Sequence, residues 1–310
     1  MSEENESVQV MVKPEEQEFK RTSLSRTLIS LALFIAVDYW IFQSWFAVIL
    51  LATVILIHEL GHFIAMKVFG YKTVNMTFVP FVGAYVSGKA TNLSRKNKLI
   101  VLLAGPVPGI IIGCTALYLH QQNYEYTYFQ VAITFLLLNT FNLLPVFPLD
   151  GGQFFQALFF NGSRIIQLIF LAFSFGTLVY LFFTLHTSWT LLLIAFLVLL
   201  RMSNLVFVNR VRKKLDEKGI DYACSYDDLT DDEYWQIRAV IINESKVLGR
   251  KYSADYPADD EQPIIRHIES VLVPAYEDDL TFLNKIIFTI VWLAAFAFPV
   301  LQWMHYKGFF

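Results

Sequence analysis

Residues 46–69 read FAVILLATVILIHELGHFIAMKVF, an apolar run that carries His58, Glu59 and His62 in its second half. The run is long enough to cross a membrane, which takes about 20 mainly apolar residues. Titratable side chains are costly at membrane depth and mark a functional site there by default. In a helix the two histidines, four positions apart, project from one face. The stretch therefore predicts a membrane-spanning helix with a functional site built into it.

The composition of the whole chain agrees with a membrane protein. Of 310 residues, 55% are hydrophobic and 16% are charged, whereas soluble domains are nearer 45–50% and about 25%. A soluble globule of this size could not bury so much apolar surface. The net charge of −3 provides no general basic field for a phosphate backbone. These values exclude an ordinary cytosolic enzyme, a disordered protein and a nucleic-acid binder.

The hydrophobic pattern predicts an all-α polytopic membrane protein with about seven transmembrane helices. We expect a disordered cytoplasmic tail over 1–26, a six-helix membrane core over 27–208, a small cytoplasmic helical insertion over 209–281 and a C-terminal transmembrane helix over 282–310. The spans are predicted at 27–43, 46–69, 98–119, 128–148, 165–185, 189–208 and 283–303.

Lysine and arginine are distributed unevenly between the predicted loops. The outside segments, 43–45, 120–127, 186–188 and 304–310, hold only Lys307 of the 24 lysines and arginines. Because cytoplasmic loops carry the excess of these residues, the distribution predicts a cytoplasmic N-terminus and an outside C-terminus.

The spacing of His58 and His62 fits a metal site. Two imidazoles one helical turn apart can bind one zinc ion, and Glu59 could then hydrogen-bond a zinc-bound water as general base. Gly61 keeps the helix surface open beside the ion. The alternative is a chance occurrence of a short pattern, which would leave three buried polar groups unexplained at a cost of several kcal/mol each.

A second polar segment, residues 139–152, ends the fourth predicted span. Pro145 and Pro148 break the helix, and a broken helix at membrane depth is tolerated where it lines a cavity. Asp150 is either the third metal ligand or an N-terminal cap for a helix over 151–160. Asn142 either bonds a freed substrate backbone or satisfies carbonyls orphaned by Pro145. These alternatives stay open from the residues alone.

His58-Glu-Leu-Gly-His62 and Asn142-Leu-Leu-Pro-Val-Phe-Pro-Leu-Asp150-Gly together resemble the motifs of the site-2 protease family of intramembrane zinc metalloproteases. The resemblance covers about residues 46–160 and includes a membrane-dipping β-hairpin near 78–88. It implies Zn²⁺ held by His58, His62 and Asp150, Glu59 as the catalytic base, and Asn142 as a residue that contacts substrate or shapes the site.

The resulting hypothesis is a zinc metalloendopeptidase that hydrolyses a peptide bond in or near a transmembrane segment, with Glu59 activating a zinc-bound water. The expected partners are transmembrane protein substrates, the lipid bilayer and a cytoplasmic regulator at 209–281, with no nucleic acid. The expected location is a bacterial inner membrane. Two alternatives are a catalytically silent family member that acts as a membrane scaffold or chaperone, and a metal or proton transporter.

Overall fold

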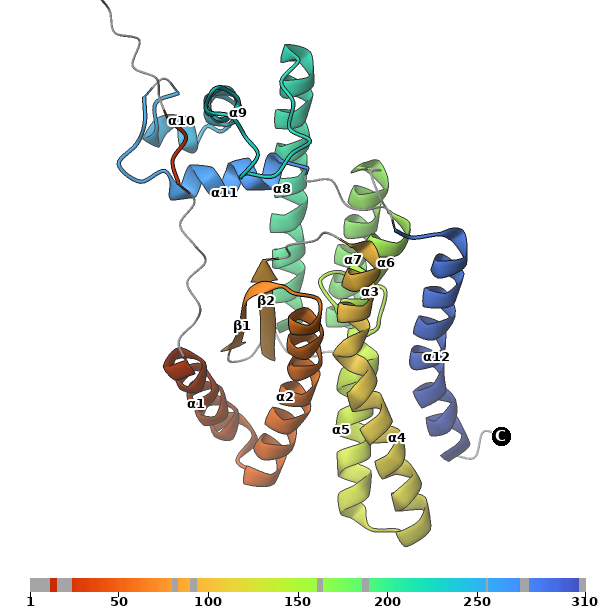
Figure 1. The fold of residues 1–310 in the computed structure, drawn as a ribbon. Coiled ribbons are helices and arrows are strands. Elements are labelled where there is room, and N and C mark those ends of the chain that lie inside the picture. The colour runs from red at the N-terminus through yellow and green to blue at the C-terminus, as the bar shows by residue number, and fades with distance from the viewer. Residues whose placement is uncertain are drawn as a thin grey trace, which may run out of the picture. The chain divides into compact units, whose positions relative to one another are not determined.

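The computed structural model describes residues 12–15, 24–79, 83–89, 94–160, 164–185, 190–254, 256–273 and 279–306. Residues 1–11 and 16–23, which make up most of the expected N-terminal tail, lie outside this range. The chain divides into two compact units, one formed by 1–19 with 203–275 and the other by 20–202 with 276–310. Each unit is described by itself below, with the elements labelled in Figure 1.

The larger unit is a mostly helical membrane region. Six helical stretches within the described residues are long and apolar enough to cross a membrane, which makes the chain a multi-pass membrane protein. They are α1 (Leu24–Phe42), α2 (Trp45–Val68), α3 (Arg95–Ala104) continued by α4 (Pro106–Asn123), α7 (Arg164–Leu185), α8 (Thr190–Lys218) and α12 (Phe282–Tyr306). The last part of α8 belongs to the other unit.

The expected count of seven spans is not confirmed, because the predicted span 128–148 folds differently. Its helix, α5 (Tyr126–Asn142), has 17 residues, about 26 Å at the helical rise of 1.5 Å per residue. That is shorter than a hydrocarbon core of about 30 Å. Pro145 and Pro148 lack the N–H that would continue the helix, so residues 143–149 are irregular before α6 (Asp150–Phe159) begins.

The predicted span 98–119 is also divided. α3 ends at Ala104 and α4 starts at Pro106, with Gly105 between them. Proline fits the first turn of a helix because the N–H it lacks has no partner there. α4 and α5 then pack as a long antiparallel pair, seen side by side in Figure 1, and α12 packs against both.

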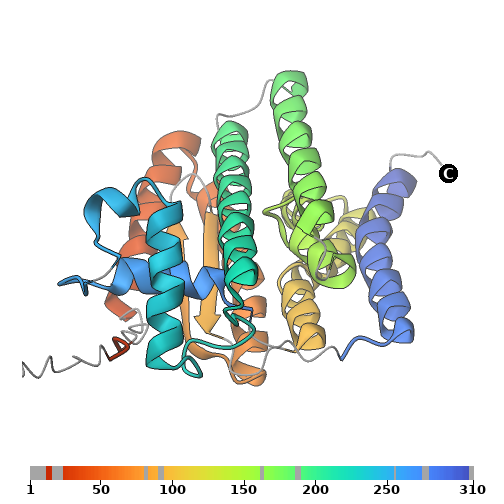
Figure 2. The same cartoon turned by 90° about the horizontal axis from the view of Figure 1, so that it is seen from above.

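A two-stranded antiparallel sheet completes the larger unit. β1 (Lys72–Val79) pairs with β2 (Gly83–Lys89), and Met76 lies opposite Val86. The sheet packs against α1 and α2, and Figure 2 shows its two strands alongside each other. This is the hairpin expected near 78–88, with residues 80–82 outside the described range.

The core of this unit lies among α3, α4, α5, α6 and α12. Its buried members include Leu99, Leu117, Leu136, Phe154 and Trp292. The indole Nε1 of Trp292 donates to the carbonyl of Leu143 at 3.0 Å. This bond ties the irregular segment after α5 to the C-terminal helix.

The smaller unit is built from α9 (Asp231–Glu244), α10 (Leu248–Lys251), α11 (Gln262–Val271) and the end of α8. Thr230 and Glu233 form the capping box that starts α9, as the sequence Thr-Asp-Asp-Glu indicates. Inside the unit, Arg238 is fully buried and pairs with Glu261 at 2.8 Å.

Residues 12–15 lie against this smaller unit, although the sequence placed them in a disordered tail. The backbone N–H of Lys13 donates to Asp231 at 2.7 Å, and its Nζ donates to the carbonyl of Leu229 at 2.7 Å. The hydroxyl of Tyr226 donates to the carbonyl of Pro14. Residues 12–15 are thus hydrogen-bonded to a unit that follows more than 200 residues later in the chain.

Candidate metal centre

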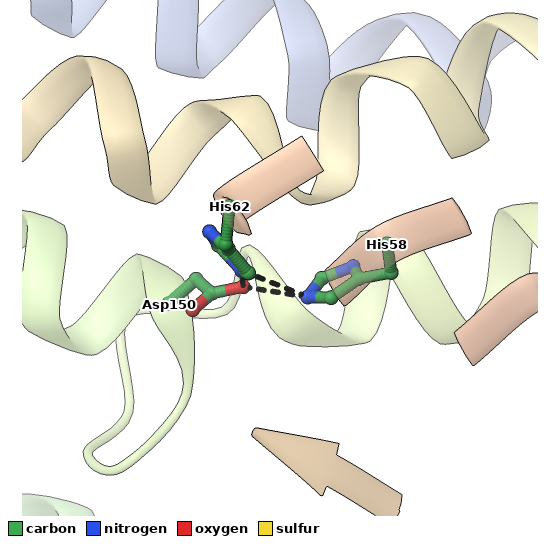
Figure 3. A group of neighbouring side chains, drawn as sticks. All are labelled: His58, His62 and Asp150. Atoms are coloured by element: carbon green, nitrogen blue, oxygen red, sulfur yellow. Dashed lines mark hydrogen bonds and ion pairs between the residues drawn. The ribbon is translucent and has the colours of Figure 1, made fainter. Parts of the chain in front are cut away.

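Three side chains from two separate parts of the chain meet at one point, shown in Figure 3. His58 and His62 come from α2, and Asp150 is the first residue of α6. Asp150 Oδ2 lies 3.0 Å from His58 Nε2 and 3.2 Å from His62 Nε2, and the two Nε2 atoms are 3.2 Å apart. All three residues are largely buried, with the Asp150 side chain 13% exposed.

This spacing fits a tetrahedral metal ion. Two ligand atoms that each lie about 2.0–2.1 Å from zinc at a tetrahedral angle are about 3.3 Å apart. The three separations found are close to that value. Two imidazoles and a carboxylate leave the fourth position of a tetrahedron open, as catalytic zinc sites do.

The orientation of His58 is set by Asn139 of α5. The Nδ1 of His58 lies 2.8 Å from Asn139 Oδ1, while Asn139 Nδ2 donates to the carbonyl of Phe135 at 2.8 Å. The second bond identifies the amide nitrogen, so Oδ1 is the acceptor and His58 Nδ1 must carry the proton. The lone pair of His58 is therefore on Nε2, the atom that faces Asp150.

His62 is oriented in the same way by α3. Its Nδ1 donates to the carbonyl of Val101 at 2.8 Å, which again leaves the lone pair on Nε2. α2 and α3 approach closely here because both carry glycine at the contact. A Cβ at Gly61 would overlap the Ala104 carbonyl oxygen, and one at Gly105 would overlap the His62 ring at Nε2.

Asp150 is placed by the irregular segment after α5. The helix of Asp150 begins only at that residue, after Leu149 in an extended conformation, so its carboxylate projects at a helix N-terminus. The partial positive charge of that end favours an acidic side chain. The alternative that Asp150 caps this helix is wrong, because Leu149 is the N-cap and no side chain makes a capping hydrogen bond there. Asp150 lies in the first turn of α6 and faces the two histidines.

Glu59 and Asn142 line the same cavity as these three residues. The cavity has a volume of about 460 Å³ and also borders β2 and α8. Glu59 is buried at 7% exposure, and the backbone of Val86 on β2 lies near its carboxylate. The structure thus brings together every residue that the sequence singled out, around a space large enough for a stretch of peptide.

Asn142 contacts its own helix through Nδ2, which donates to the carbonyl of Leu138 at 3.3 Å. The carbonyl of Phe141 cannot accept a hydrogen bond from Pro145, because proline has no N–H. It accepts instead from the N–H of Leu144 at 3.0 Å. Asn142 is therefore not the partner of the carbonyl that Pro145 leaves open.

Sequence reasoning missed Asn139 and the carbonyl of Val101. Asn139 stands three residues before Asn142, and it is a fully buried amide in an apolar helix. An asparagine within an apolar helix could therefore have been recognised from the sequence as a candidate partner of a ligand. The carbonyl of Val101 could not, because every residue has a backbone carbonyl.

Comparison with known proteins finds relatives of the part of the chain that carries both histidines and Glu59. Residues 46–125 match the family model described as Peptidase family M50. Stage IV sporulation protein FB of Bacillus subtilis is 32% identical over 120 residues, 36% of this chain and 40% of that protein. A zinc metalloprotease of Methanocaldococcus jannaschii is 32% identical over 116 residues, 36% of this chain and 33% of that protein. The match thus covers two fifths or less of these relatives.

Among solved structures, the site-2 protease from Methanocaldococcus jannaschii aligns with 57% of this chain and 86% of its own, at 24% identity and a TM-score of 0.41. The family model covers both histidines and Glu59, and the curated relatives are similar over a comparable length. The matched range contains the first of the two motifs, and the resemblance to the site-2 protease family is confirmed by the match of residues 46–125 to peptidase family M50.

Proposed function

We propose that this protein is an intramembrane zinc endopeptidase that cleaves transmembrane protein substrates. The observation that carries the proposal is the convergence of His58, His62 and Asp150 on one point, beside Glu59 in one cavity. In the neutral form of each histidine, the hydrogen bonds described above put the proton on Nδ1 and leave the lone pair of Nε2 facing that point. The donor set of two nitrogens and one oxygen suits zinc.

When bound, zinc would lower the pKa of a coordinated water and polarise the scissile carbonyl. The chain's own part in the reaction is to move the proton. Glu59 follows His58 on α2, so its carboxylate is held one residue from a ligand, in a buried position. We assign it the role of general base, which takes a proton from water and returns it to the leaving amine.

Substrate handling follows from the lining of the cavity. A helical substrate hides its carbonyls in intrahelical hydrogen bonds, so it has to unwind before its backbone can react. We propose that Asn142 hydrogen-bonds the freed backbone and that β2 offers an edge to which an extended peptide can add as a strand. β2 borders the cavity through Gly83, Ala84, Tyr85 and Val86.

The proposal also covers the membrane in which the protein lies, the sides on which its termini lie and a regulator. We propose a bacterial inner membrane with a cytoplasmic N-terminus and an outside C-terminus, and a regulator that binds the 209–281 region. The scaffold and transporter alternatives find less support. A scaffold has no use for a buried Glu59 beside the ligands, and a transporter would spread its polar groups across the membrane rather than gather them at one depth.

The decisive experiment compares the purified wild type with Glu59→Gln. We expect the variant to retain zinc at the wild-type stoichiometry and to cleave a transmembrane reporter substrate at least about a hundredfold more slowly, since general base catalysis contributes about 10²–10⁴-fold. Glu217→Gln is the matched control, because Glu217 is half-exposed and paired with Lys214 on α8. Equal cleavage by the wild type and Glu59→Gln would refute the mechanism.

A further inference from the structure

A second cavity in the larger unit has no part in the proposed reaction. It has a volume of about 190 Å³ and lies among α3, α6, α7 and α8. Three cationic side chains line it: Arg95 and Lys98 from α3, and Arg201 from α8. Two amide side chains, Gln156 and Gln167, also line it, and none of the described residues at its surface is acidic.

The three cations are close enough to repel one another. Both Arg95 and Arg201 lie within Coulombic range of Lys98. Across the described ranges, neither Lys98 nor Arg201 has an ion-pair or hydrogen-bond partner for its side chain. Like charges gathered beside apolar helices are costly unless a counter-charge joins them.

One acid, Asp279, contacts the start of α3 beside Arg95. Asp279 accepts from the Ser94 hydroxyl at 2.6 Å and from the backbone N–H of Lys96 at 3.3 Å. It thereby caps the start of α3 and is not among the residues that line the cavity. The described lining residues carry three positive charges and no negative one.

The side chain of Arg95 is held in place by its burial and by a hydrogen bond. Its side chain is buried, and its guanidinium donates to the carbonyl of Ala157 at 2.7 Å. Ala157 is in the last turn of α6, where exposed carbonyls attract a cation. The cavity thus has one buried and anchored cation, Arg95, beside the partly buried Lys98, the exposed Arg201 and two amides.

The position of the cluster along the helices resembles that of a membrane headgroup layer. Arg95 and Lys98 precede the apolar run that starts at Leu99, and Arg201 follows the apolar run Leu191–Leu200. Each cation thus stands where apolar sequence meets polar sequence. Basic pockets between transmembrane helices at this level suit phosphate-bearing lipid headgroups.

We propose that this cavity binds a phosphate group, held by Lys98 and Arg201 and bordered by Arg95 and the two glutamine amides. Lysine and arginine make short, charge-assisted hydrogen bonds to phosphate oxygens. The placement at the ends of apolar runs favours the headgroup of an anionic phospholipid as the source. Free inorganic phosphate has the same chemistry and is the other source to be tested.

The test uses the full-length protein, delipidated in detergent and mixed with phosphatidylcholine vesicles with or without phosphatidylglycerol. The variants are Lys98→Gln and Arg201→Gln, and Arg201→Lys keeps the charge. Arg210→Gln is the matched control, since Arg210 is an exposed arginine on the same helix that is not among the residues lining the cavity. Mass spectrometry then measures the phosphatidylglycerol that stays bound after repurification.

We expect the wild type, Arg201→Lys and Arg210→Gln to retain phosphatidylglycerol, and each glutamine variant at the cavity to bind it about tenfold more weakly. A second arm compares the melting temperature in phosphate and in chloride at equal ionic strength. A rise in phosphate that the two cavity variants lose, without a lipid difference, would assign the free ion. Equal lipid retention by all variants, with no phosphate-dependent rise, would overturn the proposal.

Discussion

The two histidine ligands depend on groups that would never touch the metal ion. Asn139 holds the Nδ1–H of His58, and the carbonyl of Val101 holds that of His62. Each bond fixes both the ring orientation and the tautomer, so that Nε2 keeps its lone pair for the ion. Such outer partners commonly change metal affinity 10- to 100-fold when they are removed.

Asn139→Leu should therefore weaken zinc binding about 10- to 100-fold while the helix is retained. Leucine has a similar size but cannot accept the proton of His58 Nδ1. The measurement is competition with a fluorescent zinc chelator. Asn142→Leu is the comparison, because Asn142 lines the cavity and contacts neither histidine; it should keep the zinc affinity and raise KM. Equal zinc affinity in both variants would contradict the role given to Asn139.

Gly105→Ala tests the closeness of α2 and α3 at the metal site. The added Cβ would overlap the His62 ring at the nitrogen that faces Asp150, so we expect zinc to be lost from a protein that still folds. Gly176→Ala is the matched substitution, since a Cβ there meets no atom within 4 Å in the described part of α7 and its surroundings. Zinc content of the two purified variants, measured by atomic emission, distinguishes them; wild-type zinc content in Gly105→Ala would contradict this packing.

At the scale of elements, the sequence was most informative where the geometry is local. The spacing of His58 and His62 within one helix determines that both face the same way, whatever surrounds the helix. The capping box at Thr230 also depends only on residues close together in sequence, and it is present at the start of α9. Asp150 could be placed at the end of a broken helix because Pro145 and Pro148 are visible in the sequence.

Features that depend on contacts between elements could not be predicted in this way. The division between α3 and α4 at Gly105 follows from the packing of α3 against α2 as well as from Pro106. The role of Asn139 depends on α5 lying beside α2. The binding of residues 12–15 to the smaller unit joins positions more than 200 residues apart, and short polar segments give no periodicity from which to predict it.

The smaller unit should lose stability in mild acid because of α11. His267 packs against the ring of Phe207 at a centroid distance of 6.0 Å, and burial lowers the pKa of His267 below its usual value of about 6.5. The unfolded chain therefore takes up a proton at a higher pH than the folded unit does. Stability falls as the pH drops through about 6.5 and levels off below the folded pKa.

Hydrogen exchange of the α11 amides between pH 7.5 and pH 5.5, corrected for intrinsic rates, measures this effect. We expect His267→Leu to remove the dependence in this range. The carboxyl of Glu261 titrates in a separate range, since hydrogen bonds from Arg238, the Ala258 N–H and Tyr234 outweigh burial and lower its pKa. An unchanged dependence in His267→Leu would show that another group is responsible.

At the scale of the whole molecule, the contacts of Lys13 constrain the membrane topology. Residues 12–15 hydrogen-bond to the smaller unit, so both lie on the same side of the membrane. The chain must then cross the membrane an even number of times between residue 15 and the start of α9 at Asp231. Among the described residues of that interval, the helical stretches long and apolar enough to cross are α1, α2, α3 with α4, α7 and α8, which is an odd number. We therefore predict one more crossing.

α5 with the segment that follows it is the candidate for that crossing. From Trp45 to His58 and from Tyr126 to Asn139 the chain advances by the same number of residues, and His58 contacts Asn139. Figure 1 shows the α1–α2 and α4–α5 turns at the same end of the larger unit. α5 therefore enters from the same face as α2 and reaches the metal site at the same depth. Residues 143–160 would complete the crossing, irregular only where they line the cavity.

We therefore predict that the α4–α5 turn and the α6–α7 connection lie on opposite sides of the membrane. Single cysteines at Tyr124 and Gly162, in a Cys114→Ser, Cys224→Ser background, are labelled with an impermeant maleimide in intact cells and in inverted vesicles. Tyr124→Cys should react in intact cells, and Gly162→Cys only in inverted vesicles, together with a cysteine at Glu217 in the smaller unit. The uneven distribution of lysine and arginine favours this orientation. If Tyr124→Cys and Gly162→Cys react from the same side, α5 does not complete a crossing, and residues 12–15 cannot reach the smaller unit within the same chain.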